Sequence, residues 1–172
     1  MPQTERDKAT ASLTEWLKNL TRDAAAKRIG CYLSTVDEPS TEDYLQWAHG
    51  EGLDILLPIS REDGLMDWAL YDGGDHDRDW LGMPVPTSQI KGPMEVDGVD
   101  LLLVPAASVD RTGGRLGWGR GYFDRLLGSM EKRPPVYAVV FDHEVVDSLP
   151  REPHDQGVDG AVTPSGILRF IP

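Results

Sequence analysis

The chain has 172 residues, of which 40% are hydrophobic and 27% charged, and its formal net charge is −12 at pH 7. This composition indicates a single domain over residues 1–172 with a full core, and it excludes a largely disordered chain. The acidic balance argues against a nucleic-acid surface, because a phosphate backbone requires a broad basic face. No apolar stretch has the length of a membrane span, and the N-terminus shows no hydrophobic signal region. We therefore expect a cytoplasmic protein that binds neither nucleic acid nor membrane.

Periodic apolar residues predict the elements of the first half of the chain. Spacings of three and four predict a helix over 4–20, with a stripe made of Leu13, Trp16, Leu17 and Leu20. The run IGCYL (29–33) predicts a strand, in which the lone Cys31 is interpreted as a core residue. EPST (38–41) supplies an N-cap, Ser40 or Thr41, for a helix that ends at His49 and Gly50. LDILLPI (53–59) and GLMDWALY (64–71) predict two strands, the second at an antiparallel edge.

The second half begins with a long connection. Residues 72–98 are rich in Gly, Pro and Asp, which is typical of a functional or poorly ordered loop. After it we expect a strand over 99–106, a helix from 121 or 122 to 128, a strand over 136–141, a short helix over 143–149, a strand over 158–163 and an irregular tail. Continuous apolar strands separated by helices indicate an α/β protein with a mainly parallel sheet and helices on both faces.

The stretch GGRLGWGRGYFDRLL (113–127) follows the most apolar strand. Its first part, residues 113–121, is here called the glycine–arginine loop. Glycines let the backbone approach a ligand, and the next helix directs free N–H groups into the same space. Arg115 and Arg120 add forked, charge-assisted hydrogen bonds, so the loop is predicted to bind phosphate. The spacing matches neither a dinucleotide fingerprint nor a P-loop, and an ordinary strand-to-helix turn is the alternative interpretation.

Asp124 follows this loop directly. An acid beside a cationic phosphate site is explained when a divalent cation bridges the two, and Mg²⁺ takes few protein carboxylates in such sites. The alternative is an acid in the first turn of a helix, stabilised by the helix dipole.

Four ordered motifs resemble one enzyme family. VPAASVDRTGGRLGWGRGYFDR (104–125) resembles the signature of the 5-formyltetrahydrofolate cyclo-ligases, also called 5,10-methenyltetrahydrofolate synthetases. EPST (38–41), GMPVP (82–86) and EPHDQGVDGAVTPSG (152–166) are similar to further motifs of that family, in the same order. Together they span most of residues 29–166.

The resemblance implies a three-layer, Rossmann-like α/β/α fold and an ATP- and Mg²⁺-dependent reaction. In that reaction the γ-phosphoryl group of ATP activates the formyl oxygen of 5-formyltetrahydrofolate. N10 then attacks the same carbon, phosphate leaves, and 5,10-methenyltetrahydrofolate and ADP are the other products. Catalysis of this kind depends on positioning and charge neutralisation.

The resemblance also assigns residues. Arg115, Arg120 and Tyr122 would be catalytic, and ATP would lie against Arg115, Leu116, Gly117, Trp118, Gly119, Arg120, Gly121, Tyr122 and Phe123. The folate would contact Glu38, Met66, Trp80, Met83 and Tyr122, and Mg²⁺ would be held by Asp124 and Asp155. Alternative roles stay open at this point. Glu38 is equally a helix N-terminal acid, Tyr122 equally a core aromatic, and the apolar residues equally ordinary packing.

One departure from the family pattern creates a second hypothesis. The opening PQTERDKATASLTEWL (2–17) resembles the family's second helix, so we expect the family's basic N-terminal helix to be absent, with Arg6 and Lys8 as the candidate substitutes. The alternative function is a folate- or nucleotide-binding homologue with impaired catalysis. A third hypothesis is another α/β enzyme with a sugar-phosphate or CoA ligand, which leaves Asp124 and Asp155 unexplained. We expect a monomer with a small-molecule substrate.

Overall fold

The computed structural model describes residues 1–74, 76–78, 84–86 and 89–170. The first elements are α1 (Gln3–Asp23), β1 (Arg28–Gly30), α2 (Glu42–Gly50), β2 (Asp54–Ser60) and β3 (Met66–Leu70). Then come β4 (His76–Arg78), β5 (Pro84–Pro86), β6 (Ile90–Lys91) and the 3₁₀ helix η1 (Pro93–Gly98). The next are β7 (Leu101–Pro105), β8 (Ser108–Asp110), β9 (Arg115–Leu116), α3 (Tyr122–Ser129) and β10 (Val136–Val139). The last are the 3₁₀ helix η2 (Asp142–Glu144), β11 (Val145–Val146), β12 (Gly160–Thr163) and β13 (Gly166–Arg169).

The described strands form one large sheet in the order β13-β12-β10-β7-β1-β2-β3-β6. Strands β12, β10, β7, β1 and β2 pair in parallel, and β13, β3 and β6 pair antiparallel at the two edges. The predicted mainly parallel sheet is confirmed. Strand β3 is antiparallel, as expected for residues 64–71, but it is not at the edge, because β6 pairs with it on the outer side. A smaller sheet, β11-β8-β9, follows the carboxyl end of β7, and β4 pairs with β5.

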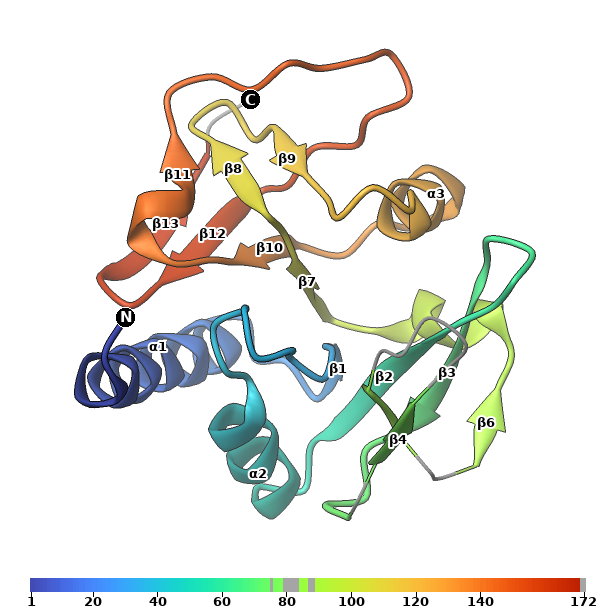
Figure 1. Cartoon of the computed structure of the whole chain (residues 1–172). Coiled ribbons are helices and arrows are strands. Elements are labelled where there is room, and N and C mark those ends of the chain that lie inside the picture. Colours follow the sequence, from blue (N-terminus) through green and yellow to red (C-terminus); the bar gives the residue numbers. More distant parts are fainter. Residues whose placement is uncertain (75, 79–83, 87–88, 171–172) are drawn as a thin grey trace.

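Helices cover both faces of the large sheet, so the three layers are confirmed. In β7, Leu101 and Leu103 pack into the core beside α1 and α2, whereas Leu102 and Val104 pack into the core beside α3 and η1. Figure 1 shows α1 and α2 together on one side of the sheet and α3 across from them. A strand buried on both faces has no polar alternation, which is why these runs are continuously apolar.

Helix α1 buries most of its predicted stripe. Leu13, Leu17 and Leu20 are at most 3% exposed, as their spacing predicts. Trp16, expected in the same stripe, lies at its edge and is 36% exposed. Thr41 is the N-cap residue of α2, but its hydroxyl donates to the carbonyl oxygen of Tyr32, so it ties the helix start to the end of β1.

Three expectations were wrong. The predicted helix over 143–149 is a 3₁₀ turn followed by β11, which pairs with β8 instead of continuing as a helix. The expected irregular tail contains β13, which pairs with β12 from Gly160↔Arg169 to Thr163↔Gly166. The expected connection over 72–98 holds β4, β5, β6 and η1. Pairing between distant segments decides each case, and local periodicity does not contain that information.

No helix in the described ranges is long and apolar enough to cross a membrane. The parallel arrangement places the carboxyl ends of β1, β2 and β7 at the same edge of the sheet. Ligands of open α/β sheets bind at that edge. The glycine–arginine loop starts there, after β8, and leads into α3.

Candidate active site

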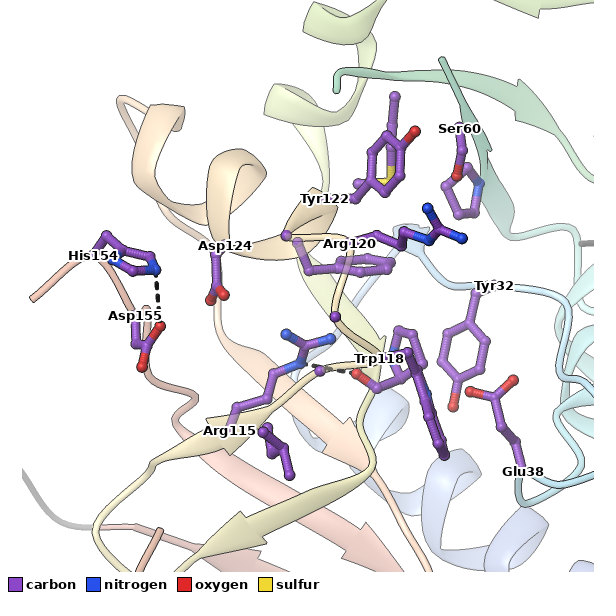
Figure 2. A pocket seen from close by; sticks show the side chains of 18 of the residues that line it. Tyr32, Glu38, Ser60, Arg115, Trp118, Arg120, Tyr122, Asp124, His154 and Asp155 are labelled. Carbon is purple, nitrogen blue, oxygen red and sulfur yellow. Dashed lines mark hydrogen bonds and ion pairs between the residues drawn. The ribbon is translucent and has the colours of Figure 1, made fainter. Parts of the chain in front are cut away.

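A cavity of about 480 Å³ opens at the carboxyl edge of the sheet. Its lining includes Tyr32 and Leu33 after β1, the end of β2, the start of β3 and the end of β7. Every residue from 115 to 124 lines it, as do Pro150, His154 and Asp155 from the far connection. Figure 2 shows how these segments surround one space. The structure therefore brings together motifs that lie more than a hundred residues apart in the sequence.

Asp110 holds the start of the glycine–arginine loop. Its Oδ1 accepts hydrogen bonds from Thr112 N and Oγ1 and from Gly114 N, and its Oδ2 accepts one from Leu149 N. Asp110 is 2% exposed, and burial alone would raise its pKa. The hydrogen bonds from Thr112, Gly114 and Leu149 outweigh burial and lower the pKa below its ordinary value. This organising role was not predicted, although Asp two residues before Thr is a turn signal.

Glycine is required at position 113 of the loop. Its φ is 93°, and a Cβ there would lie 2.7 Å from the carbonyl oxygen of Val158. Gly113 also accepts a backbone hydrogen bond from Val158 N at 2.8 Å. The loop is therefore joined directly to the start of the last parallel strand.

Arg115 is the most enclosed cation of the site. Its Nε donates to the carbonyl oxygen of Pro105 at 2.8 Å, and its guanidinium lies 5.3 Å from the centre of the Phe123 ring. Burial lowers its pKa, and the negative charge of Asp124 acts in the opposite direction. Arg120 lies exposed on the same wall of the cavity. Both predicted cations therefore face the cavity.

Tyr122 joins the start of α3 to the β2–β3 turn. Its hydroxyl donates to the carbonyl oxygen of Arg61, and Arg125 lies over its ring with a second hydrogen bond to the carbonyl oxygen of Gly64. The ring lines the cavity, but the hydroxyl is used within the protein. Gly121, the N-cap, adopts the left-handed conformation with φ 74°, which lets the chain turn into the helix.

Asp124 and Asp155, the two residues expected to hold Mg²⁺, both line the cavity. Asp124 Oδ1 accepts from Gln156 N at 3.2 Å, which holds the connection over 150–157 against α3. Asp155 Oδ2 accepts from Glu152 N at 2.7 Å, and its Oδ1 lies 3.5 Å from His154 Nε2. Within the described ranges, no cluster of three or more His, Cys, Asp or Glu side chains could hold a metal ion.

A buried acid lies on the side of the cavity away from Asp124 and Asp155, beside Trp118 of the glycine–arginine loop. Glu38 is 5% exposed, and its Oε1 accepts from Thr35 N at 2.9 Å. Burial raises its pKa, and the nearby charge of Glu144 adds to the rise, while the hydrogen bond from Thr35 and the Trp118 indole act against it. Tyr32, which was not predicted as a site residue, lies beside it and lines the same cavity.

The remaining predicted residues divide into two groups. Met66, 5% exposed, lines the cavity, and so do Leu116, Gly117, Trp118 and Gly119. Trp80 and Met83 lie outside the described residues.

The two candidate substitutes for the family's basic helix lie elsewhere. Arg6 donates to the carbonyl oxygen of Val36 at 2.6 Å and its guanidinium lies 6.0 Å from the Phe141 ring centre, and Lys8 is exposed on α1. Neither is among the residues that line the cavity.

Comparison with known proteins identifies relatives of the whole chain. The model of the 5-formyltetrahydrofolate cyclo-ligase family matches residues 1–164. The 5-formyltetrahydrofolate cyclo-ligase of Mycolicibacterium smegmatis is 31% identical over 174 residues, which cover 98% of this chain and 89% of that protein. The mouse enzyme of the same name is 28% identical over 148 residues, covering 78% of this chain and 71% of the mouse protein.

Solved structures share the fold. The 5,10-methenyltetrahydrofolate synthetase of Aquifex aeolicus superposes with a TM-score of 0.81 at 24% identity, over 100% of this chain and 86% of that one. The synthetase of Mycoplasma pneumoniae gives 0.72 at 18% identity, over 95% of this chain and 90% of that one. With a family model that matches almost its full length and a relative more than 30% identical, the chain belongs to the 5-formyltetrahydrofolate cyclo-ligase family.

Proposed function

We propose that this chain converts 5-formyltetrahydrofolate to 5,10-methenyltetrahydrofolate, with ATP cleaved to ADP and phosphate. Family membership supports the proposal. The structural observation that carries it is a single cavity lined by both the glycine–arginine loop and a buried carboxyl group. Such a cavity offers cations to a polyphosphate and an acceptor to the N–H groups of a heterocycle.

The phosphate side is the wall made by the glycine–arginine loop and the start of α3. The formyl oxygen attacks the γ-phosphorus and ADP leaves. N10 then attacks the formyl carbon and phosphate leaves. Arg115 and Arg120 neutralise charge on the phosphoryl oxygens, and the N–H groups at the start of α3 add donors. The hydrogen bond to Pro105 fixes the Arg115 guanidinium, so little reorganisation is needed when charge develops.

Asp124 and Asp155 are the carboxylates that would hold Mg²⁺. Mg²⁺ in phosphoryl-transfer sites takes one or two protein carboxylates and fills its other positions with phosphate oxygens and water, so two acids on one cavity wall suit it. When bound, the ion would shield the negative charge of the phosphates. Asp124 also retains its position in the first turn of α3, where the helix dipole stabilises it.

The folate side is the wall made by Glu38, Met66 and the Tyr122 ring. A buried carboxylate accepts hydrogen bonds from ring N–H groups, and apolar side chains pack against the ring faces. Trp80 and Met83 remain predicted members of this wall.

The test is an absorbance assay at the wavelength of methenyltetrahydrofolate, with purified protein, 5-formyltetrahydrofolate, Mg²⁺ and ATP. We expect an increase that depends on ATP and is matched by release of phosphate. A flat trace, with both ligands still binding by calorimetry, would contradict the proposal and favour the alternative of a binding homologue. If neither ligand binds, both functions are wrong.

Two properties accompany the proposed reaction. We propose that the enzyme works in the cytoplasm and as a monomer. Sedimentation equilibrium is expected to give a mass near the chain mass of 19.0 kDa. A dimer mass that does not change with concentration would contradict the monomer. Recovery of the protein outside the cytoplasmic fraction would contradict the cytoplasmic location.

A further inference from the structure

The hydroxyl of Tyr32 is buried without a hydrogen-bond partner within the described structure. Tyr32 is 4% exposed, and it follows β1 at the carboxyl edge of the sheet. Its backbone is fixed, because its carbonyl oxygen accepts from Thr41 Oγ1 at 2.8 Å. An unpartnered buried hydroxyl reduces stability, since the group loses its hydrogen bonds to water and gains none.

The protein satisfies a comparable hydroxyl elsewhere. Tyr44 is fully buried in the core beside α1 and α2, and its hydroxyl lies 2.7 Å from Thr21 Oγ1. Trp68 Nε1 and Arg28 Nε are the other described buried side-chain atoms without a partner, and neither residue lines the cavity. Tyr32 does line it, so of these three residues it is the one beside the cavity.

Tyr32 lies beside Glu38. Figure 2 shows the two side chains next to each other on the wall opposite Asp124 and Asp155. Burial and the negative charge of Glu38 raise the pKa of Tyr32, so its hydroxyl keeps its proton and remains a donor. The wall therefore presents a donor from Tyr32 next to an acceptor from Glu38.

Charge and hydrogen bonding together indicate which substrate meets this wall. Glu38 and Glu144 act on Tyr32 with negative charge, and Arg115 of the glycine–arginine loop acts on it with positive charge. A polyphosphate is repelled by the two acids and has no N–H group to donate to Glu38. The uncharged fused ring of the folate, which carries N–H donors next to a carbonyl and ring nitrogens, fits the donor and acceptor pair.

We propose that Tyr32 is a further substrate-binding residue, whose hydroxyl donates a hydrogen bond to an acceptor atom on the fused ring of the folate beside the N–H group that Glu38 binds. The inference rests on the proposed function and extends it to a residue outside the loop motifs. Two adjacent bonds of opposite direction fix the orientation of a planar ring, which places the formyl group toward the phosphate side.

The test compares Tyr32→Phe with Tyr44→Phe as a matched control. We expect Tyr32→Phe to bind 5-formyltetrahydrofolate roughly five- to tenfold more weakly by calorimetry without ATP, because one hydrogen bond is lost. Its affinity for ATP should be unchanged, its KM for the folate should rise more than its kcat falls, and its melting temperature should stay equal or rise. Tyr44→Phe should show the reverse, with a lower melting temperature and unchanged folate affinity.

Three outcomes would contradict the proposal. Unchanged folate affinity in Tyr32→Phe, with wild-type binding intact, overturns the inference alone and leaves the proposed function standing. A lower melting temperature together with equal losses for ATP and the folate shows a structural role. Absence of folate binding in the wild type overturns the proposed function, and the inference with it.

Discussion

Arg115 Nε donates a hydrogen bond to the carbonyl oxygen of Pro105 at 2.8 Å, so the cation of the glycine–arginine loop is anchored to the last residue of the central strand β7. The same guanidinium lies over the Phe123 ring at 5.3 Å. Two contacts, one from the end of β7 and one from α3, therefore fix one side chain. A guanidinium fixed in advance loses little conformational entropy when a phosphate binds.

The first prediction concerns Arg115. Arg115→Ala is expected to weaken ATP binding by about 1.5–3 kcal/mol, because it removes charge-assisted hydrogen bonds. The measurement is calorimetric titration with ATP. Arg111→Ala is the matched control, since Arg111 is an exposed arginine near the same loop that is not among the cavity residues. Equal ATP affinities in the two variants would remove Arg115 from the phosphate side.

The second prediction concerns the proposed metal pair. Asp124→Asn is expected to raise the Mg²⁺ concentration needed for half-maximal activity, because an amide is a weaker ligand than a carboxylate. The asparagine keeps the oxygen that accepts from Gln156 N, so the fold of the connection should persist. Asp147→Asn is the control, because its side chain is fully exposed. An unaltered Mg²⁺ dependence would leave Asp124 with its helix-dipole role only.

The third prediction uses the raised pKa of Glu38. Because burial makes the folded carboxyl hold its proton more tightly than the unfolded one, stability decreases as pH rises from the ordinary value, near 4.5, through the folded pKa. Glu38→Gln removes this loss and keeps an oxygen to accept from Thr35 N. We expect the variant to be at least as stable as the wild type at pH 7.

The same variant should bind the folate more weakly, by about 1.5–3 kcal/mol, since a charged acceptor is replaced by a neutral one. Thermal melts at pH 4 and pH 7, with folate titrations at pH 7, measure both effects. A variant that is less stable at pH 7 and unchanged in affinity would show that Glu38 serves the fold instead of the substrate.

The sequence predicted the parallel core well, for a physical reason. Strands such as β7 and β10 are buried on both faces, so their continuous apolar runs are unambiguous. The wrong helix over 143–149 and the missed strand β13 have another origin. Their conformations depend on pairing with β8 and β12, and short apolar runs do not distinguish strand from helix.

The site shows the same division. The glycine–arginine loop could be singled out because its glycines and arginines are adjacent in the sequence and together indicate phosphate binding. Residues 115–124 all line one cavity. Tyr32 was not predicted, because IGCYL has the composition of an ordinary core strand. Its hydroxyl lacks a hydrogen-bond partner only because of which distant residues surround it, and the sequence does not contain that information. Asp110 lies between these two cases. The sequence contains its turn signal, but it does not indicate the hydrogen bond from the distant Leu149 N.

The fourth prediction concerns Asp110 and pH. Its folded pKa is lowered, because hydrogen bonds from Thr112, Gly114 and Leu149 outweigh the effect of burial. The stabilisation is therefore fully present above the unfolded pKa, about 3.9, and is lost as pH falls through the folded pKa. Wild-type stability to urea should decrease below about pH 4.

Asp110→Asn tests this directly, because it keeps the size of the side chain but replaces one acceptor oxygen with a donor. That nitrogen must face a backbone N–H, either in the loop or at Leu149, so we expect a loss of about 2–3 kcal/mol at pH 7. The decrease in stability on acidification below about pH 4 should be smaller in the variant than in the wild type. ATP affinity should also decrease, because the loop that carries Arg115 starts from this residue. A variant with wild-type stability and an unchanged acid dependence would mean that the loop holds its shape without Asp110, and that its fixed points are Gly113 against Val158 and Arg115 against Pro105.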